Sequence, residues 1–106
     1  MHIVFCNISV EHAEALAQSV IENKLAACVN LIPGVTSFYR WKGSVQKDSE
    51  STLLIKTHSD ALEPLMQHIR KHHPYELPEI VAVAVADDDV NPAYLRWVNG
   101  QVATEK

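Results

Sequence analysis

The longest wholly apolar run of this 106-residue chain, IVAVAVA at residues 80–86, sets the strongest limit on its fold. Its length suits a strand and falls far short of the roughly 20 residues that a membrane-spanning helix needs. Successive side chains of a strand point to opposite faces of the sheet, so Val on one face and Ile or Ala on the other leave both faces apolar. A sheet that contains this strand therefore needs apolar cover on each side.

The other strand signals predict a long hairpin in the middle of the chain. Pro33-Gly34 interrupts its first strand, and we expect a bulge there because proline lacks the amide donor of the ladder. Lys42-Gly43 supplies a tight turn, after which the chain can return as the next strand. The four expected strands span residues 2–8, 27–41, 45–57 and 80–86.

Three helices are expected between and after these strands. Pro74 ends the second helix, because the residue before a proline is pushed out of helical space. The expected N-caps of the three are Ser9, then Ser59 or Asp60, then Asn91. The order β-α-β-β-α-β with a terminal helix predicts an α+β, ferredoxin-like fold in a single domain, residues 1–106.

This arrangement predicts self-association. An antiparallel sheet with helices on one side normally shows a polar second face, whereas residues 80–86 are apolar on both. The simplest cover for the second face is another copy of the same chain, and the overlong hairpin can reach across to it. We therefore expect a homo-oligomer.

The charge balance excludes several classes of partner. Thirteen acids against nine Lys and Arg give a net charge of -4, whereas nucleic-acid binders carry a basic face or an aromatic-basic signature. Neither nucleic acid nor a membrane is therefore an expected partner.

The cysteine count and the first residues bear on the compartment. Two cysteines are too few for a disulfide-stapled scaffold, and the first residues lack the basic region of a signal peptide. We therefore expect a cytoplasmic protein.

One cluster of potential metal ligands follows from the expected topology. The first strand and the second helix both end where the fourth strand begins, which brings Cys6 close to His72 and His73. A thiolate with two imidazoles favours copper or zinc over calcium or magnesium. In the alternative interpretation, Cys6 is a small buried residue of the core and the two histidines stabilise the C-terminus of the helix.

Other potential sites are weaker. His68 and His72 form an i,i+4 pair that could chelate a metal, although exposed pairs of this kind are usually just solvated. Cys6 with His73 as its base lacks a third orienting residue, so no enzyme is expected. Cys28 lies in an apolar strand and is expected in the core. Packing and subunit contact is the expected role of the aromatic set, which comprises Tyr39, Trp41, Tyr75, Tyr94 and Trp97, and Glu76 and Glu79 are expected to form a polar rim.

Five segments resemble the signature of the CutA divalent-cation tolerance family, in the same order and spacing over almost the whole chain. They are LAACVNLIPGVTS at residues 25–37, YRWKG at 39–43, IKT at 55–57, HPYELPEI at 73–80 and YLRW at 94–97. The resemblance implies a ferredoxin-like protomer in a homotrimer similar in architecture to the PII signalling proteins. It also implies a non-enzymatic role in tolerance and response to divalent metals, copper above all, with zinc or another divalent cation as alternatives.

The resemblance also bears on the site. The proposed copper ligands of the family fall on Cys6, His72 and His73, which favours the metal cluster over its alternative. Asn7 follows the cysteine where a threonine is common. A second hypothesis is a PII-like regulator whose intersubunit clefts bind a small anionic metabolite, and a third is a purely structural or partner-anchoring trimer. For the regulator, the cleft residues expected are Lys56, Arg40, Tyr75 and Glu79.

Overall fold

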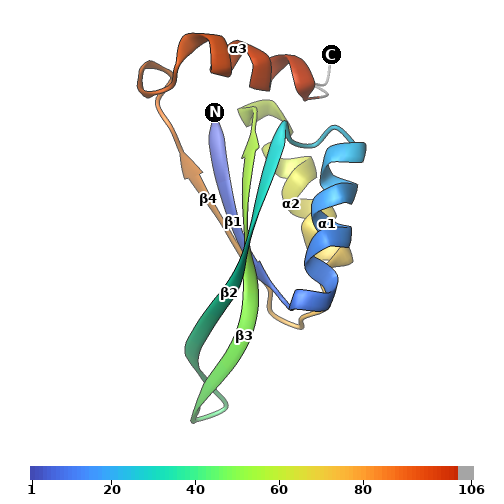
Figure 1. Ribbon diagram of the computed structural model, residues 1–106, viewed down its shortest axis with the longest axis vertical. Coiled ribbons are helices and arrows are strands. Elements are labelled where there is room, and N and C mark those ends of the chain that lie inside the picture. Colours follow the sequence, from blue (N-terminus) through green and yellow to red (C-terminus); the bar gives the residue numbers. More distant parts are fainter. Residues whose placement is uncertain (103–106) are drawn as a thin grey trace.

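A computed structural model describes residues 1–102 and confirms the ferredoxin-like order of elements (Figure 1). The strands are β1 (His2–Ile8), β2 (Cys28–Trp41), β3 (Ser44–Thr57) and β4 (Glu79–Ala84). The helices are α1 (Val10–Glu22), α2 (Leu62–His72) and α3 (Pro92–Gln101), with 3₁₀ turns η1 (Ser59–Ala61) and η2 (Asp87–Asp89). No helix in this part of the chain is long and apolar enough to cross a membrane.

The strands form one antiparallel sheet in the order β2-β3-β1-β4. Helices α1 and α2 cover one face of this sheet (Figure 1). The inner strand β1 sends Val4, Cys6 and Ile8 to that face, where all three are fully buried. They pack with Leu53 and Ile55 of β3 and with apolar residues of both helices in a single core. The main core therefore lies between the sheet and these two helices, and Val98 of α3 is buried outside it.

Two helix starts differ from the expected caps. The Ser9 hydroxyl pairs with Nδ1 of His12 at 2.8 Å and makes no side-chain bond to the helix backbone. The second helical segment is capped by His58, which precedes both expected caps, and its Nδ1 accepts the Asp60 amide N–H at 2.9 Å. This cap explains why the segment opens with η1 before α2 begins. The third expected cap, Asn91, is confirmed and accepts from the first turn of α3.

Strand β4 ends at Ala84, two residues before the end of the apolar run at residue 86. Ala84 pairs with His2, the first residue of β1, so the neighbouring strand offers no further ladder partner. Beyond Ala84, the Val85 N–H donates to the carbonyl of Met1, the residue just before β1, at 3.0 Å. The length of β4 is thus set by its partner strand rather than by its own hydrophobicity.

The β2–β3 hairpin has 14 residues in each strand and projects well beyond the body of the molecule (Figure 1). Lys42 and Gly43 have φ angles of 51° and 82°, as a two-residue type I′ turn requires. The expected bulge is present, because Pro33 and Gly34 together oppose the single residue Ser51 between two regular stretches of pairing. The turn and the bulge therefore fix the register along the whole hairpin.

The bulge also decides which way the hairpin side chains point. Before it, the odd-numbered Leu31 of β2 pairs with the core residue Leu53. After it, Tyr39 pairs with Gln46 and Trp41 with Ser44, which are even positions of β3 and share the face opposite the core. One extra residue in a strand reverses the alternation of its side chains. Both aromatic residues therefore leave the core side of the sheet.

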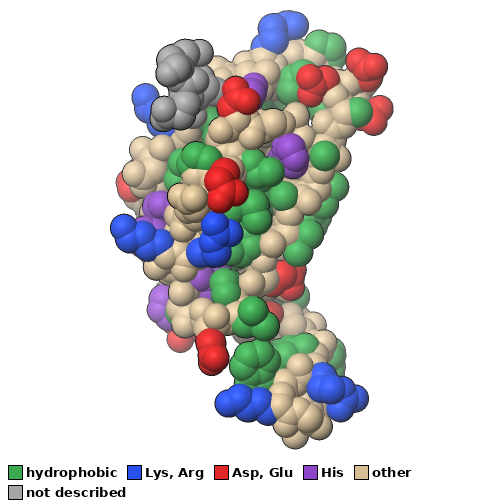
Figure 2. Space-filling model, turned by 180° about the vertical axis from the view of Figure 1, so that it is seen from behind, with side chains coloured by type: hydrophobic (Ala, Val, Ile, Leu, Met, Phe, Trp, Pro, Cys, Tyr) green, Lys and Arg blue, Asp and Glu red, His purple; other side chains and the backbone are tan. Residues whose placement is uncertain are grey.

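The sheet face opposite α1 and α2 carries exposed apolar side chains along β1 and β4. Phe5 of β1 pairs with Val81 of β4, and these side chains are 36% and 51% exposed. Figure 2 shows apolar side chains gathered along the back of the molecule, above the hairpin. The expectation that Cys28 lies in the core is wrong, because it pairs with Lys56 on this second face and is only half-buried. The chain by itself thus leaves one side of its sheet in water.

We predict that Val81→Asp disrupts self-association, because a carboxylate buried in an apolar contact costs several kcal/mol. Sedimentation of the unmodified protein is expected to give a multiple of the 11.8 kDa chain mass, and the variant is expected to sediment closer to a single chain. Val10→Asp serves as the control, because Val10 is 58% exposed at the start of α1, away from the sheet. A mass of 11.8 kDa for the unmodified protein at micromolar concentration would contradict the prediction.

Candidate functional site

Cys6 lies near the end of β1, as expected, but its thiol is enclosed. The side chain is fully buried on the core face of the strand. Burial raises the pKa of the Cys6 thiol to about 12, and the negative charges of Glu79 and Glu50 add to the increase. Its Sγ lies 4.0 Å from the Asn7 carbonyl oxygen. The thiolate, which is the form that binds metals, is therefore disfavoured in the metal-free chain.

His73 lies just outside α2, as the following proline predicts. It precedes Pro74, and its backbone is extended with ψ at 135°. The ring turns inward and is buried, and its Nε2 donates to the Asn7 carbonyl at 2.9 Å. Its Nδ1 accepts the Tyr75 N–H at 3.2 Å. These partners place the ring proton on Nε2 and engage both ring nitrogens.

His72 takes a different direction from His73. It is exposed at the end of α2, and its ring centroid lies 4.3 Å from that of His68, one turn earlier. The structure thus brings Cys6 and His73 to the same Asn7 carbonyl and places His72 with His68. Within residues 1–102, no group of three or more His, Cys, Asp or Glu side chains is arranged to hold a metal ion.

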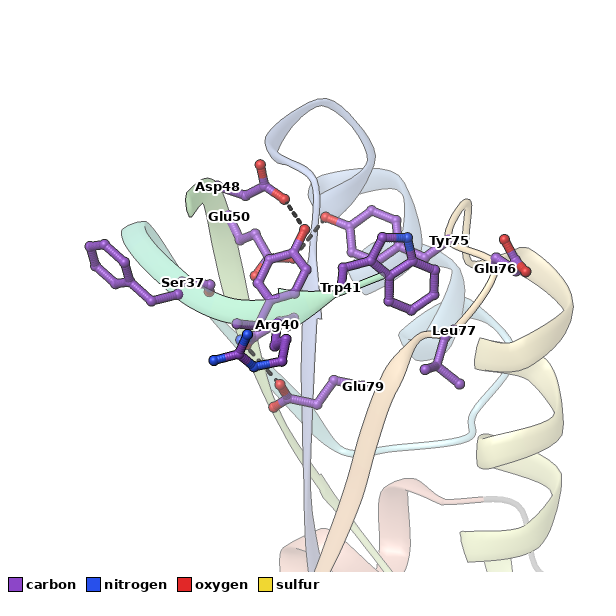
Figure 3. Close-up of a pocket in the computed structure, with 12 residues that line it drawn as sticks. Ser37, Arg40, Trp41, Asp48, Glu50, Tyr75, Glu76, Leu77 and Glu79 are labelled. Carbon is purple, nitrogen blue, oxygen red and sulfur yellow. Dashed lines mark hydrogen bonds between the residues drawn. The ribbon is translucent and has the colours of Figure 1, made fainter. Parts of the chain in front are cut away.

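A cleft of about 770 Å³ opens between the part of the hairpin beyond the bulge and the 75–79 segment that leads into β4. Figure 3 shows the side chains of these two parts facing one another. Four aromatic residues line the cleft, namely Phe38, Tyr39, Trp41 and Tyr75. The carboxyl groups in its lining are those of Asp48, Glu50, Glu76 and Glu79. The single cationic side chain in this lining is that of Arg40. The cleft is therefore both aromatic and strongly acidic.

Two tyrosine hydroxyls hold two of these carboxylates in place. Tyr75 donates to Oε2 of Glu50 at 2.8 Å, from the 75–79 segment to the hairpin (Figure 3). Tyr39 donates to Asp48 between the two strands of the hairpin. Burial, then the hydrogen bond to Glu50, raises the pKa of Tyr75 well above its ordinary value. For Tyr39, the hydrogen bond to Asp48 is the largest cause of a raised pKa. Both hydroxyls therefore stay protonated and act as donors at neutral pH.

Asn7 connects the cleft to the Cys6–His73 pair. Its Nδ2 donates to Glu79 at 3.4 Å, and its Oδ1 accepts from the Thr52 hydroxyl at 2.7 Å. Its backbone carbonyl is the group that accepts from His73 on the opposite side of β1. One residue thus contacts both candidate sites, one through its side chain and one through its backbone.

The structure sorts the residues expected for a ligand cleft. Arg40, Tyr75 and Glu79 line it as expected, whereas Lys56 lies on the apolar sheet face and donates to Asn30. Asp48 and Glu50 were missed, because nothing local distinguishes them from solvated strand residues. The signal that could have revealed them is that both acids lie at alternate positions of one hairpin strand, while the strand before the tight turn is rich in aromatic residues.

The chain is similar to known proteins over most of its length. The family model described as CutA1 divalent ion tolerance protein matches residues 2–101. The divalent-cation tolerance protein CutA of Thermus thermophilus is 46% identical over 90 residues, which cover 85% of each protein. Protein CutA of Mus musculus is 47% identical over 87 residues, covering 82% of this chain and 48% of that protein. The chain spans about half the length of the mouse and plant relatives that it matches.

Solved structures share the fold over nearly the whole chain. The PII-like protein CutA from Nostoc sp. PCC 7120, in apo form, has a TM-score of 0.95 at 39% identity and covers 99% of this chain and 100% of its own. The divalent cation tolerance protein of Thermus thermophilus has a TM-score of 0.90 at 41% identity, with coverage of 97% and 100%. Both the hairpin and the terminal helix therefore belong to a fold that these proteins share.

We predict that Tyr75→Phe lowers the free energy of unfolding by about 1–3 kcal/mol, because it leaves the buried Glu50 carboxylate without its hydroxyl donor. Tyr39→Phe is the matched control and is expected to cost less, since its partner Asp48 is exposed and can be hydrated instead. Urea unfolding of both variants at pH 7 measures the difference. Equal losses of unfolding free energy in the two variants would show that the Tyr75–Glu50 hydrogen bond stabilises the fold no more than the Tyr39–Asp48 bond does.

Proposed function

The chain belongs to the CutA1 divalent ion tolerance family, and from that premise we propose that it is a non-catalytic, self-assembling protein that binds copper or a similar divalent ion. The observation that carries this proposal is the convergence of Cys6 and His73 on one carbonyl oxygen, that of Asn7. A thiol and an imidazole at the end of a central strand form a donor set suited to copper or zinc. The biological role that fits is tolerance and response to metal ions.

The proposed ligands are Cys6, His72 and His73, and their contacts define what binding requires. His73 must exchange at least one of its two hydrogen bonds for the ion, and His72 must turn from His68. The Cys6 thiol must lose its proton, which a bound cation promotes because it stabilises the thiolate. Binding is therefore expected to release protons and to be linked to a local rearrangement around the end of β1.

The working particle that we propose is a homotrimer in the cytoplasm. The uncovered apolar face of the sheet supports self-association, and the projecting hairpin supplies a segment that can extend over a neighbouring copy. The shared fold with a PII-like protein supports three copies rather than two. Cys6 and Cys28 are both unlinked thiols, which suits a reducing compartment.

We predict that Cys6→Ser, His72→Ala and His73→Ala each weaken copper binding by about tenfold or more, since each removes a donor atom. A competition titration of the assembled protein against a copper chelator of known strength measures this, with zinc titrated in parallel. His2→Ala is the control, because His2 pairs with Ser59 at the opposite end of β1. Unchanged copper affinity in all three variants would contradict the proposed ligand set.

A second candidate function, that of a ligand-responsive regulator, is favoured by the charge of the cleft. Four carboxylates against a single guanidinium disfavour the anionic metabolite expected from the sequence. Aromatic faces and carboxylates together attract ammonium and guanidinium groups, through cation–π contacts and charge-assisted hydrogen bonds. The cleft volume of about 770 Å³ falls within the range of small-molecule sites. The ligand that we propose is therefore a small organic cation.

We predict that small amines such as putrescine or choline raise the melting temperature of the assembled protein, because a ligand of the folded state stabilises it by mass action. AMP and citrate at the same ionic strength are expected to have no such effect, since the carboxylates repel them. Glu76→Gln removes an exposed cleft charge without touching the core and is expected to weaken the amine effect. Stabilisation by the anions instead of the amines would contradict a cation site.

A further inference from the structure

The outer surface of the two packed helices carries a pair of histidines that already lie together. His68 and His72 are one turn apart on α2, with ring centroids 4.3 Å apart and ring planes at 44°. Positions i and i+4 of a helix place two imidazoles on one face, where both can bind a single ion. No side chain has to leave the core to bring these two rings together.

A contact from α1 holds one member of the pair. The half-buried His68 ring is hydrogen-bonded through Nε2 to the Ser19 hydroxyl at 2.5 Å. While this bond persists, Nδ1 is the His68 nitrogen that can coordinate an ion. A hydrogen bond to the second nitrogen is how proteins commonly orient a metal-binding imidazole, and it reduces the entropy lost on binding.

A depression beside the pair offers room for an ion and its waters. It has a volume of about 270 Å³ and is lined by His12, Ala15, Leu16 and Ser19 of α1 and by His72 of α2.

We propose that His68 and His72 form a two-histidine site for a divalent transition-metal ion on the outer helical face, with water completing the coordination. This site goes beyond the proposed function, because it uses neither Cys6 nor His73 and pairs His72 with the ring that it already contacts. Neutral imidazole binds both copper and zinc, and Cu²⁺ is expected to bind more tightly than Zn²⁺. The helices cover the sheet face opposite the apolar one, so the site stays open when copies associate through the latter.

Isothermal titration of the assembled protein with Zn²⁺, and with Cu²⁺ against a competing chelator, tests this site. His68→Gln and His72→Gln are each expected to lower the affinity at least tenfold, because each removes one of the two donor nitrogens. Glutamine at position 68 retains a polar group for Ser19, so the helix packing is kept. His12→Gln is the matched control, because it removes a histidine from the same depression without touching the pair.

Unchanged affinity in His68→Gln would overturn the two-histidine site. A loss in His12→Gln as large as that in His68→Gln would also overturn it, because binding would then be spread over surface histidines. A loss in Cys6→Ser or His73→Gln with none in His68→Gln would support the buried ligand set in its place. The two metal proposals therefore fail separately, since each depends on a residue that the other does not use.

Discussion

A sheet with two apolar faces is stable only when both are covered, and most features of this molecule follow from how that demand is met. The strand β1 alternates Val4 and Cys6 toward the helices with Phe5 toward the opposite face. On the helical side, the apolar surface is buried within one chain, and each Å² removed from water stabilises the fold by roughly 25 cal/mol. On the other side, Phe5 and Val81 are left in water, so the same free energy is gained only through contact with further copies.

The cleft depends on a second constraint, the single extra residue at Pro33-Gly34. Without it, Tyr39 and Trp41 would point to the helical side of the sheet, away from Glu50 and Asp48. With it, the hairpin carries aromatic and acidic side chains on one face, and the segment from residue 75 to residue 79 closes the cleft from the other side. The bulge therefore builds one wall of an acidic cleft.

The sequence predicted features that depend on local pattern. Four strands, three helices, the bulge, the tight turn and the two apolar faces all follow from periods of two or 3.6 residues and from the positions of Pro and Gly. It failed where a side chain's direction depends on distant partners. The His73 ring turns inward to the Asn7 carbonyl while His72 turns to His68, and Cys28 faces away from the core because of its register with Lys56. The cleft combines residues from the hairpin and the 75–79 segment, so no single stretch of sequence reveals it.

His73 and Tyr75 stand two residues apart in one short segment, yet one is tied to the Asn7 carbonyl and the other to the Glu50 carboxylate. An ion that draws His73 away from Asn7 must also shift the tether of Tyr75, because the Tyr75 N–H is itself bonded to the His73 ring. The two sites would then share one free energy of coupling, which is reciprocal by thermodynamic necessity. Whatever factor the ion imposes on the affinity of the cleft, an occupant of the cleft imposes on the affinity for the ion. In the proposed function, the metal site and the cleft would therefore influence each other through one short segment, residues 73–75.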